Sequence, residues 1–130
     1  MLEFGIDQDA FPHKDITEAI IGAAFEVYNN LGYGYLHRVH QNSLQVELNQ
    51  RGRRIELEKR INVHYKHVSV GYYDADLIVD AAVIVEVKIA PQYDKRDEAQ
   101  LLNLLKASGL KVGVLLNFGR YKVEYRRLVF

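Results

Sequence analysis

The stretch YDADLIVDAAVIVEVK, residues 73–88, decides the fold, because it contains two runs of strand character separated by a short turn. β-Branched and aliphatic residues dominate both runs, and we predict strands over Val68–Val79 and Ala82–Ile89. Asp80-Ala81 forms the turn between them. The stretch therefore predicts an antiparallel hairpin.

The register of this hairpin gathers charged side chains on one face. A three-residue connection over 80–82 places Asp76 opposite Glu86, and Asp74 opposite Lys88. Because side chains alternate along a strand, all four lie on the same face. The opposite face is apolar and is predicted to be core, formed by Ala75, Leu77, Val79, Val83, Val85 and Val87.

Two interpretations of the charged face follow from the residues. In the first, the hairpin is amphipathic, its charged face is solvated, and Asp74 forms a weak surface pair with Lys88. Against this, like charges directly opposite each other destabilise a sheet, and Asp76 faces Glu86 in this way. In the second, a metal cation or Lys88 lies between the two carboxylates, whose Cβ atoms lie about 5 Å apart in such a pair, and removes the repulsion.

Composition excludes several classes of protein. Seventeen Lys and Arg balance seventeen Asp and Glu in 130 residues, which excludes a uniformly basic protein that coats DNA. The absence of Cys excludes disulfides and thiolate metal sites, so a metal would be held by carboxylate, imidazole or backbone oxygen, as Mg²⁺ and Mn²⁺ are. The apolar runs are shorter than the ~18 residues of a membrane span, and we expect a cytoplasmic protein.

The chain reads as one domain with a short leading segment. Residues 1–14 show no periodicity and are predicted to form an N-terminal arm, followed by a single domain over residues 15–130. Asp15, with Glu18 as its reciprocal partner, is predicted to cap the first helix.

Periodicity predicts the order ααβββαββ, an α/β fold. Apolar residues recur at helical spacing from Ile16 to Leu31 and again in Leu36, Val39, Leu44 and Val46. Besides the hairpin, we predict strands over 55–65, 111–117 and 122–129 and a helix over 94–108.

The residues resemble a known family. Asp76 followed by Glu86-Val87-Lys88 resembles the D…ExK signature of the PD-(D/E)XK nuclease superfamily. About three-quarters of the chain is similar to the small bacterial GxxExxY proteins, in the blocks IIGAAFEVYNNLGYGYL, ADLIVDAAVIVEVK and EAQLLNLLKASGLKVGVLLNFG. The resemblance implies a restriction-endonuclease-like αβββαβ core, with a mixed central sheet flanked by helices.

The resemblance also implies roles for individual residues. Asp76 and Glu86 would bind Mg²⁺ or Mn²⁺, with the backbone carbonyl of Val87 as a further ligand. Lys88 would orient or help to deprotonate the attacking water, and Gln100 would brace the site. The expected partner is nucleic acid, DNA in preference to RNA, and a homodimer could form.

The sequence departs from the family at its name-giving motif. The Gly-x-x-Glu-x-x-Tyr positions read Gly34 to His40, with His37 in place of Glu and His40 in place of Tyr. Two interpretations stay open: His37 serves as a helical metal ligand, or both are ordinary surface histidines. Leu104 stands where related nucleases often place a Tyr, and Glu26 is an alternative acid or a solvated helix residue.

The function predicted from these residues is a metal-dependent nuclease that hydrolyses phosphodiester bonds of DNA or RNA. The alternative is a catalytically degenerate protein of the same fold that serves as a nucleic-acid-binding or oligomerisation module. Four tyrosines could stack on bases or cover core edges, namely Tyr33, Tyr35, Tyr72 and Tyr73.

Overall fold

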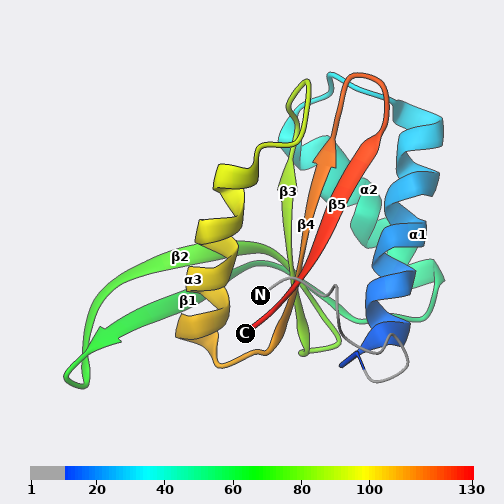
Figure 1. Cartoon of the computed structure of the whole chain (residues 1–130). Coiled ribbons are helices and arrows are strands. Elements are labelled where there is room, and N and C mark those ends of the chain that lie inside the picture. The colour runs from blue at the N-terminus through cyan, green and yellow to red at the C-terminus, as the bar shows by residue number, and fades with distance from the viewer. Residues whose placement is uncertain (1–10) are drawn as a thin grey trace.

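Five strands form one mixed sheet in the computed structural model, which describes residues 11–130 (Figure 1). The strand order is β1-β2-β3-β4-β5; only β3 and β4 are parallel, and the other neighbours are antiparallel. The strands are β1 (Ile55–Tyr65), β2 (Val68–Val79), β3 (Val83–Lys88), β4 (Val112–Phe118) and β5 (Val123–Val129).

Helices cover both faces of this sheet. Helices α1 (Lys14–Leu31) and α2 (His37–Gln50) pack on one face, and α3 (Glu98–Ser108) packs on the other after a short 3₁₀ turn, η2 (Lys95–Asp97) (Figure 1). The predicted chain order and the mixed sheet flanked by helices are confirmed. None of the helices within residues 11–130 is both long and apolar enough to cross a membrane.

The core consists of two apolar layers, one on each side of β3 and β4. These strands are runs of Val, Leu and Ile, and every residue except Lys88 is buried. This is the composition expected of strands covered on both faces. Gly113 allows α3 to approach the sheet, since a Cβ there would lie 2.9 Å from the Leu101 side chain.

The register of the β2–β3 hairpin is the predicted one, but the pairing is shorter. The ladder includes Leu77 with Val85 and ends there, before Asp76 and Glu86. The sequence predicted that Asp76 and Glu86 are directly opposed in the ladder. This prediction is wrong, because the two strands separate at this point. Beyond it, β1 and β2 continue together as a two-stranded ribbon that projects from the body (Figure 1).

The side-chain alternation reverses where the ribbon leaves the sheet. Leu57 of β1 and Leu77 of β2 pack under α1 and α2. Ile61, four residues after Leu57, and Ala75, two residues before Leu77, pack under α3 instead. A regular strand would keep them on one face. The reversal falls at Glu58, whose φ of 50° lies in the left-handed region. The prediction that Ala75 and Leu77 share a face is therefore wrong.

Two helix predictions also need correction. Helix α1 begins at Lys14, and Asp15 lies inside its first turn, so Asp15 is not the cap; the N-cap residue is His13, whose side chain makes no capping hydrogen bond. In α2 the predicted apolar stripe has the wrong phase, because Leu36 and Val46 are exposed. The buried face is His40, Gln41, Leu44 and Leu48. Of the predicted arm, residues 1–10 lie outside the described residues, and Phe11 packs into the core.

The β2–β3 turn generates a stability prediction. Asp80 and Ala81 both have positive φ, 53° and 55°, and the Ala82 N–H donates to the Val79 carbonyl. The left-handed region costs a residue with a Cβ about 1 kcal/mol. Ala81→Gly is therefore expected to raise the free energy of unfolding by about 0.5–1 kcal/mol in urea denaturation. Ala82→Gly, the matched control at negative φ, should lower it; equal effects would contradict the turn geometry.

Candidate active site

The separation of β2 and β3 creates a fork that two carboxylates bridge. The Asp76 N–H donates to Glu86 Oε2 at 2.9 Å, and the Val87 N–H donates to Asp76 Oδ2 at 2.7 Å. Each acid therefore accepts a hydrogen bond from the backbone of the opposite strand, in place of the missing ladder bonds. The crossed pair fixes both side chains at the fork.

His37, at the start of α2, points into the same fork. Its Nε2 lies 3.2 Å from Asp76 Oδ2 and 3.0 Å from the Val87 carbonyl oxygen. Both partners are acceptors, so Nε2 carries a hydrogen in this arrangement. The hydrogen bond to Asp76 raises the pKa of His37, although partial burial opposes the shift. His37 is exposed, as one interpretation of the sequence expected, and its ring also contacts Asp76 and Val87, two of the predicted metal ligands.

Gln41 and Glu58 also contact the fork, through hydrogen bonds of Gln41 to Glu58 and to the backbone of Asp76. Neither residue was predicted from the sequence. Gln41 is 4% exposed, and its Nε2 donates to the Asp76 carbonyl at 2.9 Å and to Glu58 Oε2 at 2.6 Å. The signal for Gln41 was its spacing, four residues after His37 on the same helix face. Nothing comparable marked Glu58, because its role depends on a left-handed backbone.

Burial makes this site electrostatically unusual. Glu86 is 5% exposed, and burial, reinforced by the negative charge of Asp76, raises its pKa to about 7. The Asp76 N–H, Lys88 and His37 act in the opposite direction. Lys88 itself is half-buried, and among residues 11–130 no hydrogen bond or ion pair engages its ammonium.

An open cavity of about 570 Å³ lies at the fork and collects the predicted site residues. It is lined by Tyr33, Gly34, Tyr35, Leu36, His37, Asp74, Asp76, Glu86, Val87, Lys88, Ile89 and Gln100. All six residues predicted for the site from sequence, from His37 to Gln100, are therefore in this lining. Asp74 is also there, but its ion pair is with Arg60, at 3.6 Å, and not with Lys88 as one interpretation of the sequence expected.

His40, Glu26 and Leu104 lie outside the site. His40 is fully buried, its Nε2 bonds the Gly32 carbonyl at 2.9 Å, and its ring packs 4.5 Å from that of Phe118. It therefore fixes the loop before α2, and the surface interpretation is wrong for it. Glu26 bonds Asn30 on the same helix, and Leu104 is core.

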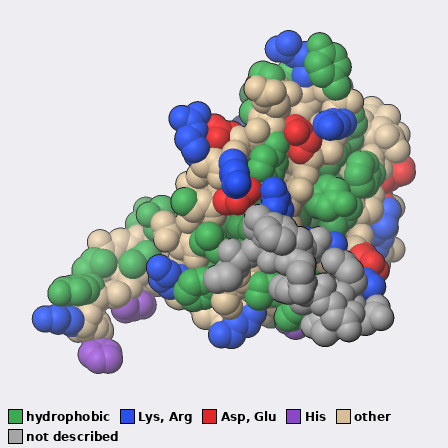
Figure 2. All heavy atoms as spheres, in the orientation of Figure 1, with side chains coloured by type: hydrophobic (Ala, Val, Ile, Leu, Met, Phe, Trp, Pro, Cys, Tyr) green, Lys and Arg blue, Asp and Glu red, His purple; other side chains and the backbone are tan. Residues whose placement is uncertain are grey.

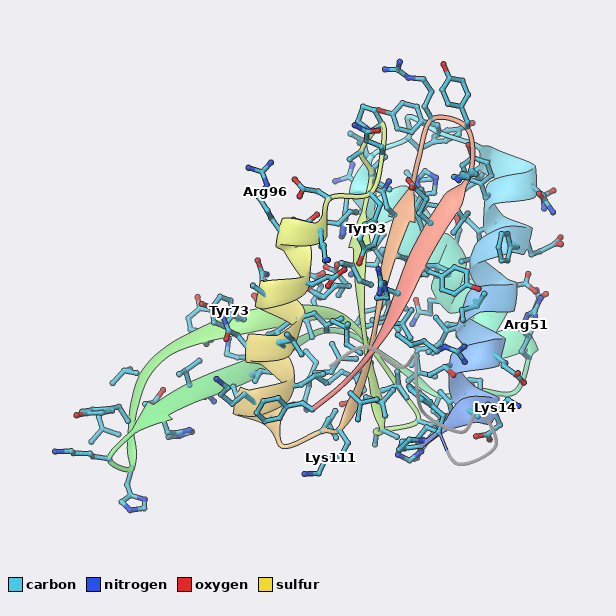
Figure 3. All side chains as sticks on the ribbon, viewed as in Figure 1. Lys14, Arg51, Tyr73, Tyr93, Arg96 and Lys111 are labelled. Carbon is cyan, nitrogen blue, oxygen red and sulfur yellow. The ribbon has the colours of Figure 1, made fainter. Side chains whose placement is uncertain are left out.

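The strand end that carries Lys88 is braced by side chains that replace the sheet ladder. Asn117, opposite Lys88 on β4, accepts from the Ala90 N–H and donates to the Ala90 carbonyl, both at 3.0 Å. Tyr93, between the start of α3 and the sheet, donates to Glu98 at 2.7 Å (Figure 3). These bonds hold the segment between β3 and α3 in place.

The donor set fits a hard divalent cation. Two carboxylates, the Val87 carbonyl and the His37 imidazole provide only oxygen and nitrogen donors. Within residues 11–130, no three His, Asp or Glu side chains converge on one point as they stand. Asp76 Oδ2 and Glu86 Oε2 each accept a backbone N–H, and the second oxygen of each carboxylate remains as a further acceptor.

Comparisons with known proteins agree with this geometry. The fold is restriction-endonuclease-like: the crystal structure of SSO0001 superposes with a TM-score of 0.55 at 17% sequence identity, covering 90% of this chain. A family model described as the PD-(D/E)XK nuclease superfamily matches residues 14–128, and the chain belongs to this superfamily, whose members are generally nucleases. The chain covers 57% of the SSO0001 chain. No curated protein matches the chain in sequence.

The contacts of Gln41 predict a coupled loss of stability and order. Gln41→Met keeps the length of the side chain but leaves Glu58 and the Asp76 carbonyl without their donor. We expect the free energy of unfolding to fall by about 1–3 kcal/mol. In hydrogen exchange, the Asp76 and Val87 amides should lose protection. Gln50→Met, an exposed position on the same helix, is the control, and unchanged protection in Gln41→Met would contradict the role assigned to it.

The buried carboxylate pair predicts a pH dependence of stability. Glu86 holds its proton more tightly in the folded protein than in the unfolded chain, so the stability of the metal-free protein should fall as pH rises from 4.5 through 7. With chelator present, Glu86→Gln should raise the free energy of unfolding at pH 8 by at least about 1 kcal/mol. At pH 4 the gain should vanish. Glu56→Gln, an exposed acid, should show no such dependence; a gain independent of pH would refute the assignment.

Proposed function

We propose that this protein is a metal-dependent nuclease that hydrolyses phosphodiester bonds of DNA in preference to RNA, with Mg²⁺ or Mn²⁺ as cofactor. The observation that carries the proposal is the pair of the partly buried Asp76 and the buried Glu86, crossed over the fork with Lys88 in the same cavity. A like-charged pair of this kind is costly unless it serves a cation. Membership of the nuclease superfamily supports the choice of reaction.

The proposed roles follow from the positions of the donors. Asp76 and Glu86 hold the cation with the Val87 carbonyl, and His37 completes the set once Nε2 has lost its hydrogen and Nδ1 carries it. A bound cation lowers the pKa of a water and offsets charge that develops on the phosphate. Lys88, whose ammonium has no competing described partner, orients the attacking water. Gln100 reaches the cavity from α3 and braces the substrate side.

The remaining predictions from sequence belong to the same proposal. We place the chain among the GxxExxY proteins, as a single domain over residues 15–130, in the cytoplasm. A possible homodimer belongs to the same proposal. The match to the PD-(D/E)XK nuclease superfamily supports the first of these statements at the level of the superfamily.

A second candidate function rests on His37. Its Nε2–H donates to Asp76 and to the Val87 carbonyl, which are two of the proposed metal ligands. An N–H donor in this position takes the place of a cation and satisfies the same acceptors. The alternative is therefore a degenerate relative that binds nucleic acid or oligomerises without catalysis.

Metal binding and cleavage distinguish the two candidates. Isothermal titration of Mn²⁺ and Mg²⁺ should give saturable binding to the wild type and to Lys88→Ala, and none to Asp76→Ala/Glu86→Ala. With Mn²⁺ and labelled DNA, Lys88→Ala should cleave at least about 10²-fold more slowly than the wild type, and the double variant should be inactive. Glu56→Ala, outside the cavity, is the control and should behave as wild type. Absence of binding at millimolar metal, together with absence of cleavage, would establish the degenerate alternative.

A further inference from the structure

We propose that the substrate is a single nucleic-acid strand and that the β1–β2 ribbon binds it, with Tyr72 as a platform on which an unpaired base stacks. The proposal rests on the nuclease function proposed above and names the substrate class of the same site. It is carried by an exposed aromatic and cationic stack on the ribbon that is continuous with the carboxylate cavity.

The stack is formed by side chains on neighbouring strands. The Arg60 guanidinium carbon lies 3.7 Å from the centre of the Tyr72 ring, and Arg60 Nε lies 3.6 Å from Asp74 Oδ1. Tyr72 is 53% exposed and the Arg60 side chain 58%. The ion pair and the ring contact hold the guanidinium over the ring, and both side chains remain open to solvent. Tyrosine rings and guanidinium planes are the surfaces on which unpaired bases stack.

The stack and the carboxylates belong to one continuous surface. Asp74, which pairs with Arg60, lines the same cavity as Asp76 and Glu86. Tyr72 precedes Asp76 by four residues of strand, or about 13 Å. A strand whose phosphate lies at the carboxylates therefore reaches the stack with a nearby base.

Two further exposed aromatic residues line the cavity. Tyr33 and Tyr35, in the loop between α1 and α2, are 37% and 51% exposed. The cavity therefore offers aromatic rings of its own, besides the ribbon stack, for a neighbouring base. The other face of the ribbon is engaged differently, because Tyr73 lies beside α3 and shares a cavity with Asn103 and Lys106 (Figure 3).

The charge of this surface favours one strand over a duplex. Double-stranded DNA is held largely through many phosphate contacts, and paired bases present their edges instead of their faces. Here Arg60 is paired with Asp74 and Lys59 with Glu56, and the whole chain has no net charge. Along the exposed ribbon, hydrophobic side chains are prominent, and Lys and Arg side chains lie both at its tip and closer to the body (Figure 2). Stacking, which needs little charge, is the interaction this surface provides.

Binding without cleavage tests the proposal. Fluorescence anisotropy in chelator, at low salt, measures a labelled DNA strand and the duplex of the same sequence. The wild type should bind the single strand at least about tenfold more tightly than the duplex. Tyr72→Ala should weaken single-strand binding about tenfold, whereas Tyr72→Phe should retain it. Tyr121→Ala, an exposed ring on the β4–β5 turn outside the cavity, is the matched control and should bind as wild type.

Each outcome separates this inference from the nuclease proposal. Equal affinity for strand and duplex, or unchanged affinity in Tyr72→Ala, overturns the inference even if the wild type cleaves duplex DNA with Mn²⁺. If single-strand binding depends on Tyr72 but no cleavage occurs with any metal, the inference about binding is supported and only the proposed nuclease activity is ruled out. If sedimentation instead shows that Tyr72→Ala changes the oligomeric state of the protein in the absence of nucleic acid, the ribbon binds a second copy of the chain and the inference is wrong. Thermal unfolding of each variant confirms that the fold is retained.

Discussion

The site depends on one constraint, which is that two carboxylates, one buried and one partly buried, must stay together at the point where the sheet divides. Asp76 and Glu86 repel each other, and burial removes the water that would screen them. Their backbone hydrogen bonds, each to the opposite strand, offset part of this cost. Those N–H groups are available only because β2 and β3 have stopped pairing. The electrostatic problem and the interruption of the sheet are therefore a single feature.

The interruption in turn determines the shape of the molecule. For β2 to leave β3, the β1–β2 pair must bend out of the sheet, and the left-handed Glu58 provides the bend. Gln41 stabilises it from α2 through the Glu58 carboxylate and the Asp76 carbonyl, and His37 one turn earlier contacts Asp76 from the same helix. One helix face thus positions the site and the base of the ribbon. The exposed stack at Tyr72 is carried outward by the same bend.

Local sequence signals predicted the parts of this arrangement that local forces determine. The strand character of residues 73–88 fixed the register through Leu77 and Val85, and the resemblance located the acids and Lys88. The break in pairing was not predictable, because it depends on contacts between distant elements. Period-two alternation carries no sign of a left-handed Glu58. The buried position of His40 was not predictable either, because a single polar residue in the sequence does not reveal that it will bond a buried carbonyl, that of Gly32.

In the proposed relationship to the GxxExxY proteins His37 replaces a helical Glu, and this replacement is best judged by counting charge. A third carboxylate would add a negative charge to a fork where burial already raises the pKa of Glu86. With His37, Asp76 and Glu86 alone would balance a divalent cation, and a neutral imidazole would add a donor without adding charge. When the cation is absent, the Nε2–H of the same ring satisfies Asp76 and the Val87 carbonyl. The substitution therefore stabilises the empty fork, and cation binding must compete with the hydrogen bonds of His37.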